Sequence, residues 1–307
     1  MASKQEQRRQ RQLNHALIEA AKQGSLADIQ SLLDRHAVIN ARDRSNHTPL
    51  HHASRKGHHQ CIEILLDRHA DINALERTYN YTPLHYAATS GHHQCVEILL
   101  DRHADINARD YYNNYTALHL ASAGGHHQCI ERLLAYGPDI NAQDHHGQTP
   151  LHLASKNDHL QCIELLLARH ADINALGASN STPLHYAATS GHHQCVEILL
   201  DRHANINARD YDSSTPLHLA SWRRHHQCIE ILLDYGADKS LINVRLSLSL
   251  SICKHISHEC INNRQSIPTH HSHSLISHQI NGHTPDQCAK DSSIVELIQN
   301  HGTSIHP

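Results

Sequence analysis

The chain has 307 residues, a formal net charge of -4 at pH 7, and 36 histidines, while only 39% of its residues are hydrophobic. The 26 basic and 30 acidic residues give no overall positive field, which argues against a nucleic-acid partner. No apolar run reaches the roughly 18 residues of a membrane-spanning helix, and residues 1–12 lack the apolar stretch of a secretory signal. We therefore expect a cytoplasmic protein, or alternatively a nuclear one, with reduced cysteines and no membrane partner.

A sequence repeat fills most of the chain. The string Thr48-Pro49-Leu50-His51 returns at Thr82, Thr116 (with alanine in place of proline), Thr149, Thr182 and Thr215, at spacings of 34 or 33 residues. A second string, HHQCIEILL, begins at His58 and recurs in phase with the first. A period of about 20 to 50 residues is typical of solenoids, in which each repeat packs against its neighbours.

Each repeat predicts two short helices. Thr48 suits the N-cap of the first helix, and Pro49 suits its first turn, where the missing amide proton costs nothing. Gly57 predicts the end of that helix, in the left-handed conformation. The second helix begins near His58 and carries one apolar stripe, which we expect the neighbouring repeat to bury. The stripe consists of Cys61, Ile62, Leu65 and Leu66.

The pattern Thr-Pro-Leu-His-x-Ala, a Gly-His pair, a Leu-Leu pair and Ala-Asp-Ile-Asn-Ala, at this period, resembles the ankyrin repeat. The resemblance implies an all-α solenoid of about seven to eight helix-turn-helix repeats, with projecting β-turn fingers and a concave face built from fingers and first helices. It divides the chain into a polar N-terminal tail (1–12), ankyrin repeats (13–243), an insertion (244–279) and a C-terminal capping repeat (280–307).

Several turn positions depart from the glycine usual in this family. Two residues before the threonine, most fingers carry asparagine or serine, and asparagine tolerates the left-handed region well. These residues are Asn46, Asn80, Asn114, Asn180 and Ser213. Histidine fills the turn after five of the second helices, at His36, His69, His103, His170 and His203. Asp158 and Arg224 replace the glycine that ends the first helix, at a cost of about 1 kcal/mol each where the left-handed geometry is kept.

Residues 244–279 interrupt the last repeat. Thr215 and Thr284 are 69 residues apart, and removing these 36 residues restores the period, since 69 − 36 = 33. The segment is rich in serine and histidine and has no helical periodicity. It begins with valine, whose codons start with GT, and ends with glutamine, whose codon can be CAG, so one hypothesis is a translated intron. The alternative is a genuine disordered loop.

The sequence carries no motif of an enzyme active site: it has no phosphate-binding glycine loop, no His-Glu-x-x-His helix and no Gly-x-Ser-x-Gly elbow. The six cysteines that recur in phase lie on the apolar stripes, which favours core packing over a redox or metal site. The spacing Cys253-x-His255-x-x-His258-x-Cys260 in the insertion matches no common zinc site. We therefore predict that the protein is not an enzyme and has neither a metal nor a cofactor.

Most histidines and asparagines at repeated positions have expected structural roles. The resemblance implies that the histidine of Thr-x-Leu-His forms hydrogen bonds that tie fingers and repeats together. Because the ordinary pKa of histidine is about 6.5, we expect stability to fall at mildly acid pH. The asparagines that close each Leu-Leu unit should bond the finger backbone. They are Asn40, Asn73, Asn107, Asn141, Asn174 and Asn207.

Residues that differ between otherwise near-identical repeats best indicate a binding surface. Tyrosines collect in the fingers, and Trp222-Arg223 stands where two other repeats have Thr-Ser. Tyrosine, tryptophan and arginine are enriched at interface hot spots; the alternative is that some tyrosines only pack fingers together. The predicted partner-binding residues are Arg55, Lys56, Tyr79, Tyr81, Tyr111, Tyr112, Tyr115, Lys156, Asn157, Tyr211, Trp222 and Arg223.

These patterns predict a monomeric, non-catalytic scaffold or adaptor that binds a protein partner through the concave face. The alternative is the substrate-receptor subunit of a larger catalytic or ubiquitin-ligase assembly.

Overall fold

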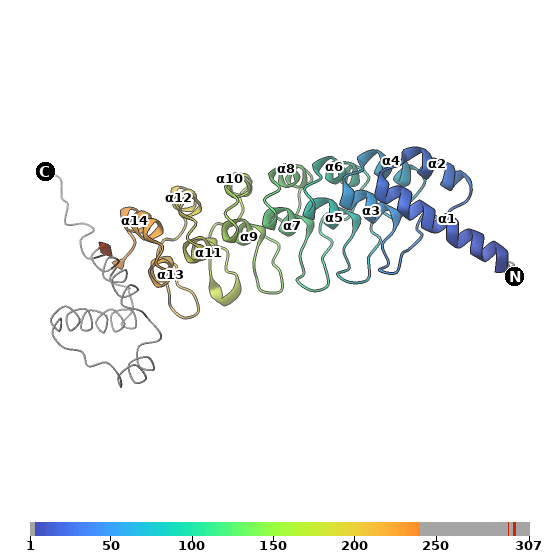
Figure 1. The fold of residues 1–307 in the computed structure, drawn as a ribbon. Coiled ribbons are helices and arrows are strands. Elements are labelled where there is room, and N and C mark those ends of the chain that lie inside the picture. Colours follow the sequence, from blue (N-terminus) through green and yellow to red (C-terminus); the bar gives the residue numbers. More distant parts are fainter. Residues whose placement is uncertain (1–3, 240–293, 295–296, 299–307) are drawn as a thin grey trace, which may run out of the picture. The chain divides into compact units, whose positions relative to one another are not determined.

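The computed structural model describes residues 4–239, 294 and 297–298, and the chain divides into two compact parts, residues 1–178 and 179–307 (Figure 1). The described residues form fourteen α-helices and one short 3-10 helix and contain no strand. In these ranges no helix combines the length and the apolar character that crossing a membrane requires. The all-α class predicted from the sequence is confirmed for the described residues.

The helices of the N-terminal part are α1 (Lys4–Gln23), α2 (Leu26–Asp34), α3 (Pro49–Lys56), α4 (His59–Asp67), α5 (Pro83–Thr89), α6 (His93–Asp101), α7 (Ala117–Ala123), α8 (His127–Ala135), α9 (Pro150–Lys156) and α10 (Leu160–Ala168). The 3-10 helix η1 (Ala178–Asn180) follows. The C-terminal part contains α11 (Pro183–Ser190), α12 (His193–Asp201), α13 (Pro216–Arg223) and α14 (His226–Asp234).

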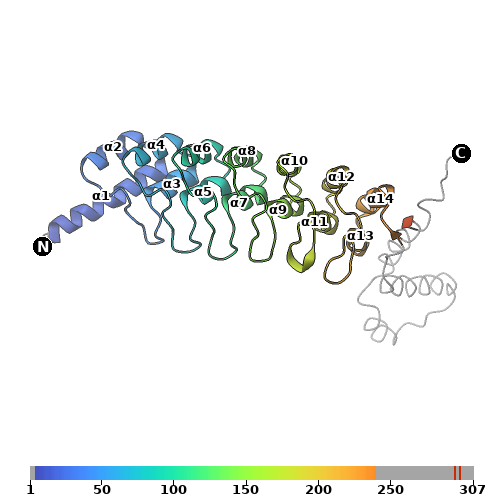
Figure 2. The same ribbon diagram turned by 180° about the vertical axis from the view of Figure 1, so that it is seen from behind.

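Each repeat contributes one helix to each of two layers. In the N-terminal part, α1, α3, α5, α7 and α9 pack side by side in sequence, and α2, α4, α6, α8 and α10 form the second layer. The fingers project from the layer of first helices, as both views show (Figures 1 and 2). In the C-terminal part, α11 packs against α13 and α12 against α14. This is the predicted solenoid of helix-turn-helix repeats.

The first helix is longer than the others because the predicted polar tail belongs to it. From Lys4 onward, the residues predicted as a tail are helical and almost entirely exposed, and Leu13 is the first buried side chain.

The predicted insertion (244–279) lies outside the described residues. The predicted capping repeat (280–307) does so too, apart from Ile294, Leu297 and Ile298, which are helical.

The predicted cap of the first helix forms with a histidine as its partner. Thr48 is the N-cap of α3, and the backbone amide of His51 donates to its Oγ1 at 3.4 Å. In return, the amide of Thr48 donates to Nδ1 of His51 at 3.1 Å. The other ring nitrogen, Nε2, lies 2.9 Å from the carbonyl oxygen of Tyr81 in the next finger. Since Nδ1 accepts a bond, Nε2 must carry the proton, and the ring bridges two repeats in its neutral form.

This bridge repeats along the chain, which confirms the role that the resemblance implied for these histidines. His85 reaches the carbonyl of Tyr115 at 3.1 Å, His119 that of Gln148 at 3.1 Å, and in the C-terminal part His185 reaches Ser214 at 3.1 Å.

The apolar stripes are buried between neighbouring repeats within each part. Leu50, Ile62 and Leu65 are at most 1% exposed in the repeat of α3 and α4. The six cysteines that recur in phase are all buried, and none of them is in a disulfide. Burial raises the pKa of Cys95 and of Cys129 to about 12, so their thiols stay protonated at neutral pH. They act as small apolar core residues, as predicted.

A second contact between repeats explains the Gly-His pair. Gly57 ends α3 with φ 77°, and a Cβ atom there would lie 2.8 Å from Nδ1 of His92 in the next repeat. The His92 ring occupies this space, and its Nε2 lies 3.2 Å from the carbonyl oxygen of Arg55 at the end of α3. The glycine is therefore needed both for its left-handed backbone and for the close approach of the neighbouring imidazole.

The predicted left-handed positions without glycine are also confirmed. The turn histidines have φ between 62° and 65°, the finger residues Asn46, Asn80, Asn114, Asn180 and Ser213 have φ between 57° and 69°, and Asp158 and Arg224 have φ of 62° and 61°.

The asparagines that close each Leu-Leu unit bond the backbone of the next repeat, and not that of their own. Asn40 Oδ1 accepts from the amide of Asp71 at 2.9 Å, and Asn73 Oδ1 accepts from the amide of Asp105 at 3.0 Å.

We predict that the protein loses stability between pH 6.5 and pH 4. Burial lowers the pKa of His51 and of His119 to about 4, whereas the unfolded chain titrates near 6.5. Below 6.5 the unfolded state therefore binds protons that the folded state does not, and each of these two histidines should cost about 2 kcal/mol at pH 5. Urea unfolding at pH 7.5 and pH 5 measures this. Stability should change little from pH 7.5 to 8.5, where the histidines are already neutral; an unchanged midpoint at pH 5 would contradict the prediction.

A pair of glycine substitutions tests the contact between repeats. Gly137 also has a left-handed backbone (φ 67°), but nothing lies within 4 Å of a Cβ placed on it. Gly137→Ala should therefore show only the backbone cost of about 1 to 2 kcal/mol. Gly57→Ala should lose about 1 kcal/mol more, because His92 must leave its bond to Arg55. Equal losses in urea unfolding would show that the imidazole contact contributes nothing.

Candidate partner-binding surface

The backbone of each finger is held by a carboxylate at its base. Asp110 Oδ1 accepts from the amide of Asn113 at 2.7 Å and from that of Tyr115 at 3.2 Å. The preceding finger is held in the same way by Glu76, which is 1% exposed and accepts from the amides of Thr78 and Tyr79. Burial alone would raise the pKa of Glu76, but these amide bonds lower it below its ordinary value, so the carboxylate remains ionised.

Neighbouring fingers are joined by a backbone hydrogen bond. The amide of Tyr111 donates to the carbonyl oxygen of Tyr79 at 2.8 Å, and the amide of His145 donates to Asn113 at 2.9 Å. The side chains on these loops are therefore presented by a backbone that is fixed at its base and at its tip.

Three tyrosines on two adjacent fingers form an exposed aromatic surface, which we call the tyrosine patch: Tyr79, Tyr111 and Tyr112. They are 45%, 68% and 57% exposed. The ring of Tyr112 lies 5.6 Å from that of Tyr79 and 5.4 Å from that of Tyr111, with edge-to-face geometry in both pairs. The structure thus brings together three residues that were predicted to bind a partner.

Two other predicted tyrosines pack inside the finger layer. Tyr81 and Tyr115 are half-buried and stack on the bridging histidines His85 and His119, with ring centroids 5.2 and 5.4 Å apart. Burial raises the pKa of Tyr81 well above its ordinary value. For these two residues the geometry favours the alternative reading, in which the ring packs the fingers and supports the exposed tyrosines.

The predicted residues at the ends of first helices have different surroundings. Arg55 and Lys56 are exposed at the end of α3, and the Arg55 guanidinium lies 5.9 Å from the ring of Tyr86. Lys156 is exposed at the end of α9. Asn157 donates its side-chain amide to the carbonyl oxygen of Ala123 at 3.1 Å and so takes part in packing between repeats. An aromatic line leads from Arg55 to the tyrosine patch through Tyr86 and Tyr81.

Three of the predicted residues belong to the C-terminal part. Tyr211 is 79% exposed on its finger, where its amide donates to the carbonyl oxygen of Ser179 at 2.8 Å. Trp222 is 67% exposed at the end of α13, and the Arg223 guanidinium lies 4.8 Å from its ring centroid.

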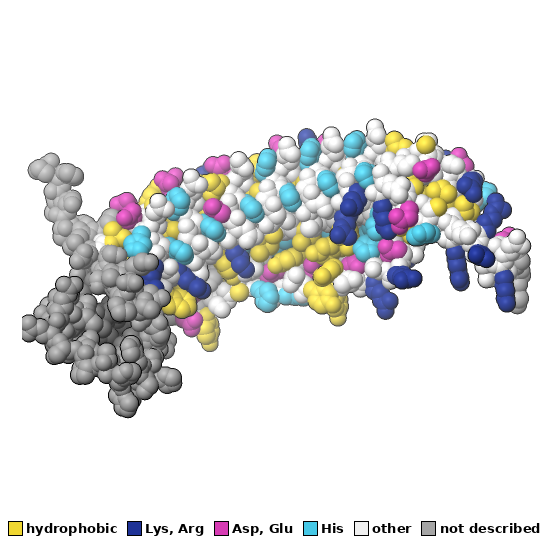
Figure 3. Space-filling view, in the orientation of Figure 1, with side chains coloured by type: hydrophobic (Ala, Val, Ile, Leu, Met, Phe, Trp, Pro, Cys, Tyr) yellow, Lys and Arg dark blue, Asp and Glu magenta, His cyan; other side chains and the backbone are white. Residues whose placement is uncertain are grey.

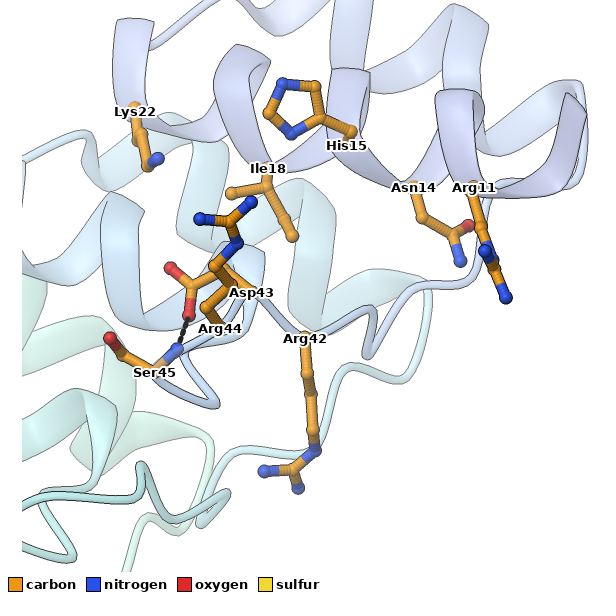
Figure 4. Close-up of a pocket in the computed structure, with 9 residues that line it drawn as sticks. All are labelled: Arg11, Asn14, His15, Ile18, Lys22, Arg42, Asp43, Arg44 and Ser45. Atoms are coloured by element: carbon orange, nitrogen blue, oxygen red, sulfur yellow. Dashed lines mark hydrogen bonds between the residues drawn. The ribbon is translucent and has the colours of Figure 1, made fainter. Parts of the chain in front are cut away.

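A basic groove at the N-terminal end was not predicted from the sequence. It has a volume of about 870 Å³ and runs between α1 and the first finger (Figure 4). Four cationic side chains line it (Arg11, Lys22, Arg42 and Arg44), against one carboxylate, that of Asp43. Basic side chains gather at this end of the N-terminal part (Figure 3). The sequence shows basic residues at 8–11 and 42–44, but only the packing of α1 against the first finger brings these two segments together.

One cluster beside this groove has the composition of a metal site. Asp43, His47 and His52 place a ligand atom each within 4.8 Å of one another. No metal site was expected from the sequence; the signal that could have found this cluster is that His47 and His52 occupy positions where the next five repeats carry no histidine.

Comparisons with known proteins agree with this architecture. A family model described as ankyrin repeats (3 copies) matches residues 17–110, 111–177 and 175–243. The crystal structure of the human ASB11 ankyrin repeat domain is similar, with a TM-score of 0.66 at 29% identity over 72% of this chain and 98% of that one. No curated protein gives a significant match. Ankyrin repeats are generally protein-protein interaction modules. Because the family model matches well over half of the chain, the chain belongs to the ankyrin repeat family.

Proposed function

We propose that the protein is a non-catalytic scaffold or adaptor that binds a protein partner through the fingers and first helices of its N-terminal part. The observation that carries this proposal is the tyrosine patch. Its three rings are 45% to 68% exposed and in mutual contact. Contiguous exposed apolar surface of this kind marks interaction sites in soluble proteins.

The physical properties of the patch suit recognition. A tyrosine ring offers a large contact area with few rotatable bonds, so ordering it on binding costs little entropy. The finger backbones below it are already fixed by Glu76, Asp110 and the bond between Tyr111 and Tyr79. A surface that is ordered before binding loses less free energy when the complex forms.

Charge around the patch favours an acidic partner surface. Arg55 and Lys56 are exposed at the end of α3, on the same aromatic line, and the basic groove lies between α1 and the first finger. Complementary charge at the rim of an interface raises the association rate and selects partners more than it raises affinity.

The non-catalytic part of the proposal is supported by how reactive groups are used. The bridging histidines engage both ring nitrogens in the packing of repeats, and the cysteines on the apolar stripes are buried as neutral thiols. These histidines and cysteines, which could otherwise act as bases or nucleophiles, therefore serve the fold.

We predict that Tyr111→Ala together with Tyr112→Ala strongly reduces partner capture while leaving helicity intact. The control is Tyr136→Ala with Tyr235→Ala, which also removes two exposed tyrosines, 42% and 44% exposed, but from the turns after α8 and α14. Quantitative proximity labelling with the full chain should show at least about a tenfold loss of specific neighbours for the first pair. The control pair should label like the natural chain, and equal labelling by all three would overturn the proposal.

Trp222 and Arg223 are tested in a further variant. Substituting both by alanine alone asks whether the C-terminal part contributes, and combining them with Tyr111→Ala and Tyr112→Ala should abolish capture. If capture survives the fourfold substitution with helicity intact, the binding surface lies elsewhere.

The alternative, a substrate-receptor subunit of a larger catalytic or ubiquitin-ligase assembly, uses the same surface and differs in what happens to the partner. An adaptor leaves the level of its patch-dependent partner unchanged when this chain is depleted, whereas a degradation receptor causes that level to rise on depletion. The labelled neighbours also report the compartment, for which we propose the cytoplasm.

A further inference from the structure

Two histidines of the first complete repeat are not part of the repeated pattern. The residue before the capping threonine is His47 here, and Tyr81, Tyr115, Gln148, Ser181 and Ser214 in the next five repeats; histidine returns there only at His283, before Thr284. The residue after Thr-x-Leu-His is His52 here, and Tyr86, Leu120, Leu153, Tyr186 and Leu219 elsewhere. Duplication of the repeat therefore does not account for either residue, although it accounts for most other histidines.

The fold brings both histidines to one carboxylate. His47 Nδ1 lies 3.4 Å from Oδ1 of Asp43, and His52 Nε2 lies 3.0 Å from Oδ2. All three ligand atoms fall within 4.8 Å of one another. A tetrahedral zinc ion with bonds of about 2.0 to 2.2 Å holds its ligand atoms roughly 3.4 Å apart. Small side-chain movements would therefore place the three atoms on one ion.

His47 is oriented for this role. Its Nε2 lies 2.8 Å from the hydroxyl oxygen of Tyr86. Its Nδ1 is buried and has no hydrogen-bond partner. The nearest carboxylate oxygen, Asp43 Oδ1, already accepts from the amides of Ser45 and His47 at 2.9 and 3.0 Å. A buried ring nitrogen that faces a carboxylate while its opposite nitrogen is held by a hydroxyl is the arrangement of a metal-ligating histidine.

The hydrogen bond of His52 fixes which tautomer would bind a cation. Because its Nε2 donates to Asp43 Oδ2 at 3.0 Å, ligation through Nε2 requires the ring proton to move to Nδ1. The side chains of His47, His52 and Asp43 are 13%, 10% and 25% exposed, which leaves an approach through Asp43.

We propose that Asp43, His47 and His52 bind a divalent zinc-class ion, with the fourth coordination position open to the basic groove. Asp43 lines both the cluster and the groove, where Lys22 and Arg44 also lie (Figure 4). These cations oppose the entry of a metal ion, so the affinity should be weaker than at a closed structural zinc site. They also favour an anionic fourth ligand, such as a carboxylate of a bound partner.

The test compares zinc binding by two double variants of the full chain, purified without a histidine tag. His47→Gln with His52→Leu introduces residues that other repeats carry at these places (Gln148, Leu120 and Leu153), so the fold should be kept. Asp43 is not substituted, because its carboxylate holds the finger backbone. The control, His145→Gln with His146→Gln, removes two exposed histidines from another finger.

Zinc is titrated in a chelator buffer, so that isolated surface histidines stay unloaded, and is counted by elemental analysis. The natural chain and the control should each bind one zinc ion more than the His47→Gln, His52→Leu variant. Their melting temperatures should rise with zinc while that of the variant does not. Cobalt(II) should give tetrahedral visible absorption in the first two proteins only. Equal zinc content in all three, or in none, would overturn the proposal.

Tyr86→Phe separates coordination from packing. It keeps the aromatic ring but removes the hydroxyl that holds His47 Nε2. Zinc affinity should fall about tenfold, with the melting temperature of the metal-free protein nearly unchanged. Unchanged zinc affinity would contradict the proposed orientation of His47. None of these outcomes depends on the tyrosine patch, so they are distinguishable from failure of the proposed partner-binding function.

Discussion

Within each part, a neutral imidazole that accepts a hydrogen bond at one nitrogen and donates one at the other connects a repeat to the one after it. In the first complete repeat, His51 accepts from the amide of its own capping threonine and reaches the carbonyl oxygen of Tyr81 in the following finger. The same ring closes the N-terminus of its helix and fixes the neighbouring loop. A solenoid has no central core, so its stability depends on contacts between neighbours. Here histidines supply two kinds of polar contact beside the apolar stripes, one at the fingers, such as His51, and one, such as His92, over the glycine that ends the first helix.

The way in which these histidines hold the fingers has a functional consequence. Because backbone bonds and buried imidazoles hold the fingers, the exposed finger side chains are free to vary without loss of fold. Tyr111 and Tyr112 lie on such a fixed loop, whereas Tyr81 and Tyr115 stack on the bridging rings beneath them. The tyrosines of one finger therefore have two roles: some support the loop and others are exposed. A tyrosine supports the loop when its ring reaches the bridging histidine of its own repeat.

The first complete repeat differs from the others in a way that sets the chemistry of the N-terminal end. The long helix α1 covers its finger side and creates a groove rich in arginine and lysine. In the same repeat, His47 and His52 converge on Asp43. The counterpart of Asp43 in a later repeat, Asp210, accepts a hydrogen bond from the finger backbone. The tyrosine patch, the basic groove and the Asp43 cluster thus all belong to the N-terminal part. Each includes side chains at positions whose residue type varies between repeats, and the positions that do not vary hold these side chains in place.

The sequence by itself determined the all-α solenoid, the helix starts at Thr48-Pro49, the left-handed turns at residues such as His69 and Asn80, and the burial of the six in-phase cysteines. These depend on local backbone preference and on the period, both of which are written in the order of residues. The sequence did not determine which tyrosines are exposed or that Asn157 bonds Ala123. It also did not show that the polar residues from Lys4 onward belong to a helix that lines a groove. Nor did it bring His47 and His52 to Asp43, because they approach one another only once the finger folds back onto its helix. The 36 histidines of the composition therefore have distinct roles that spacing alone does not separate, since burial and the partner at each ring nitrogen are decided by tertiary packing.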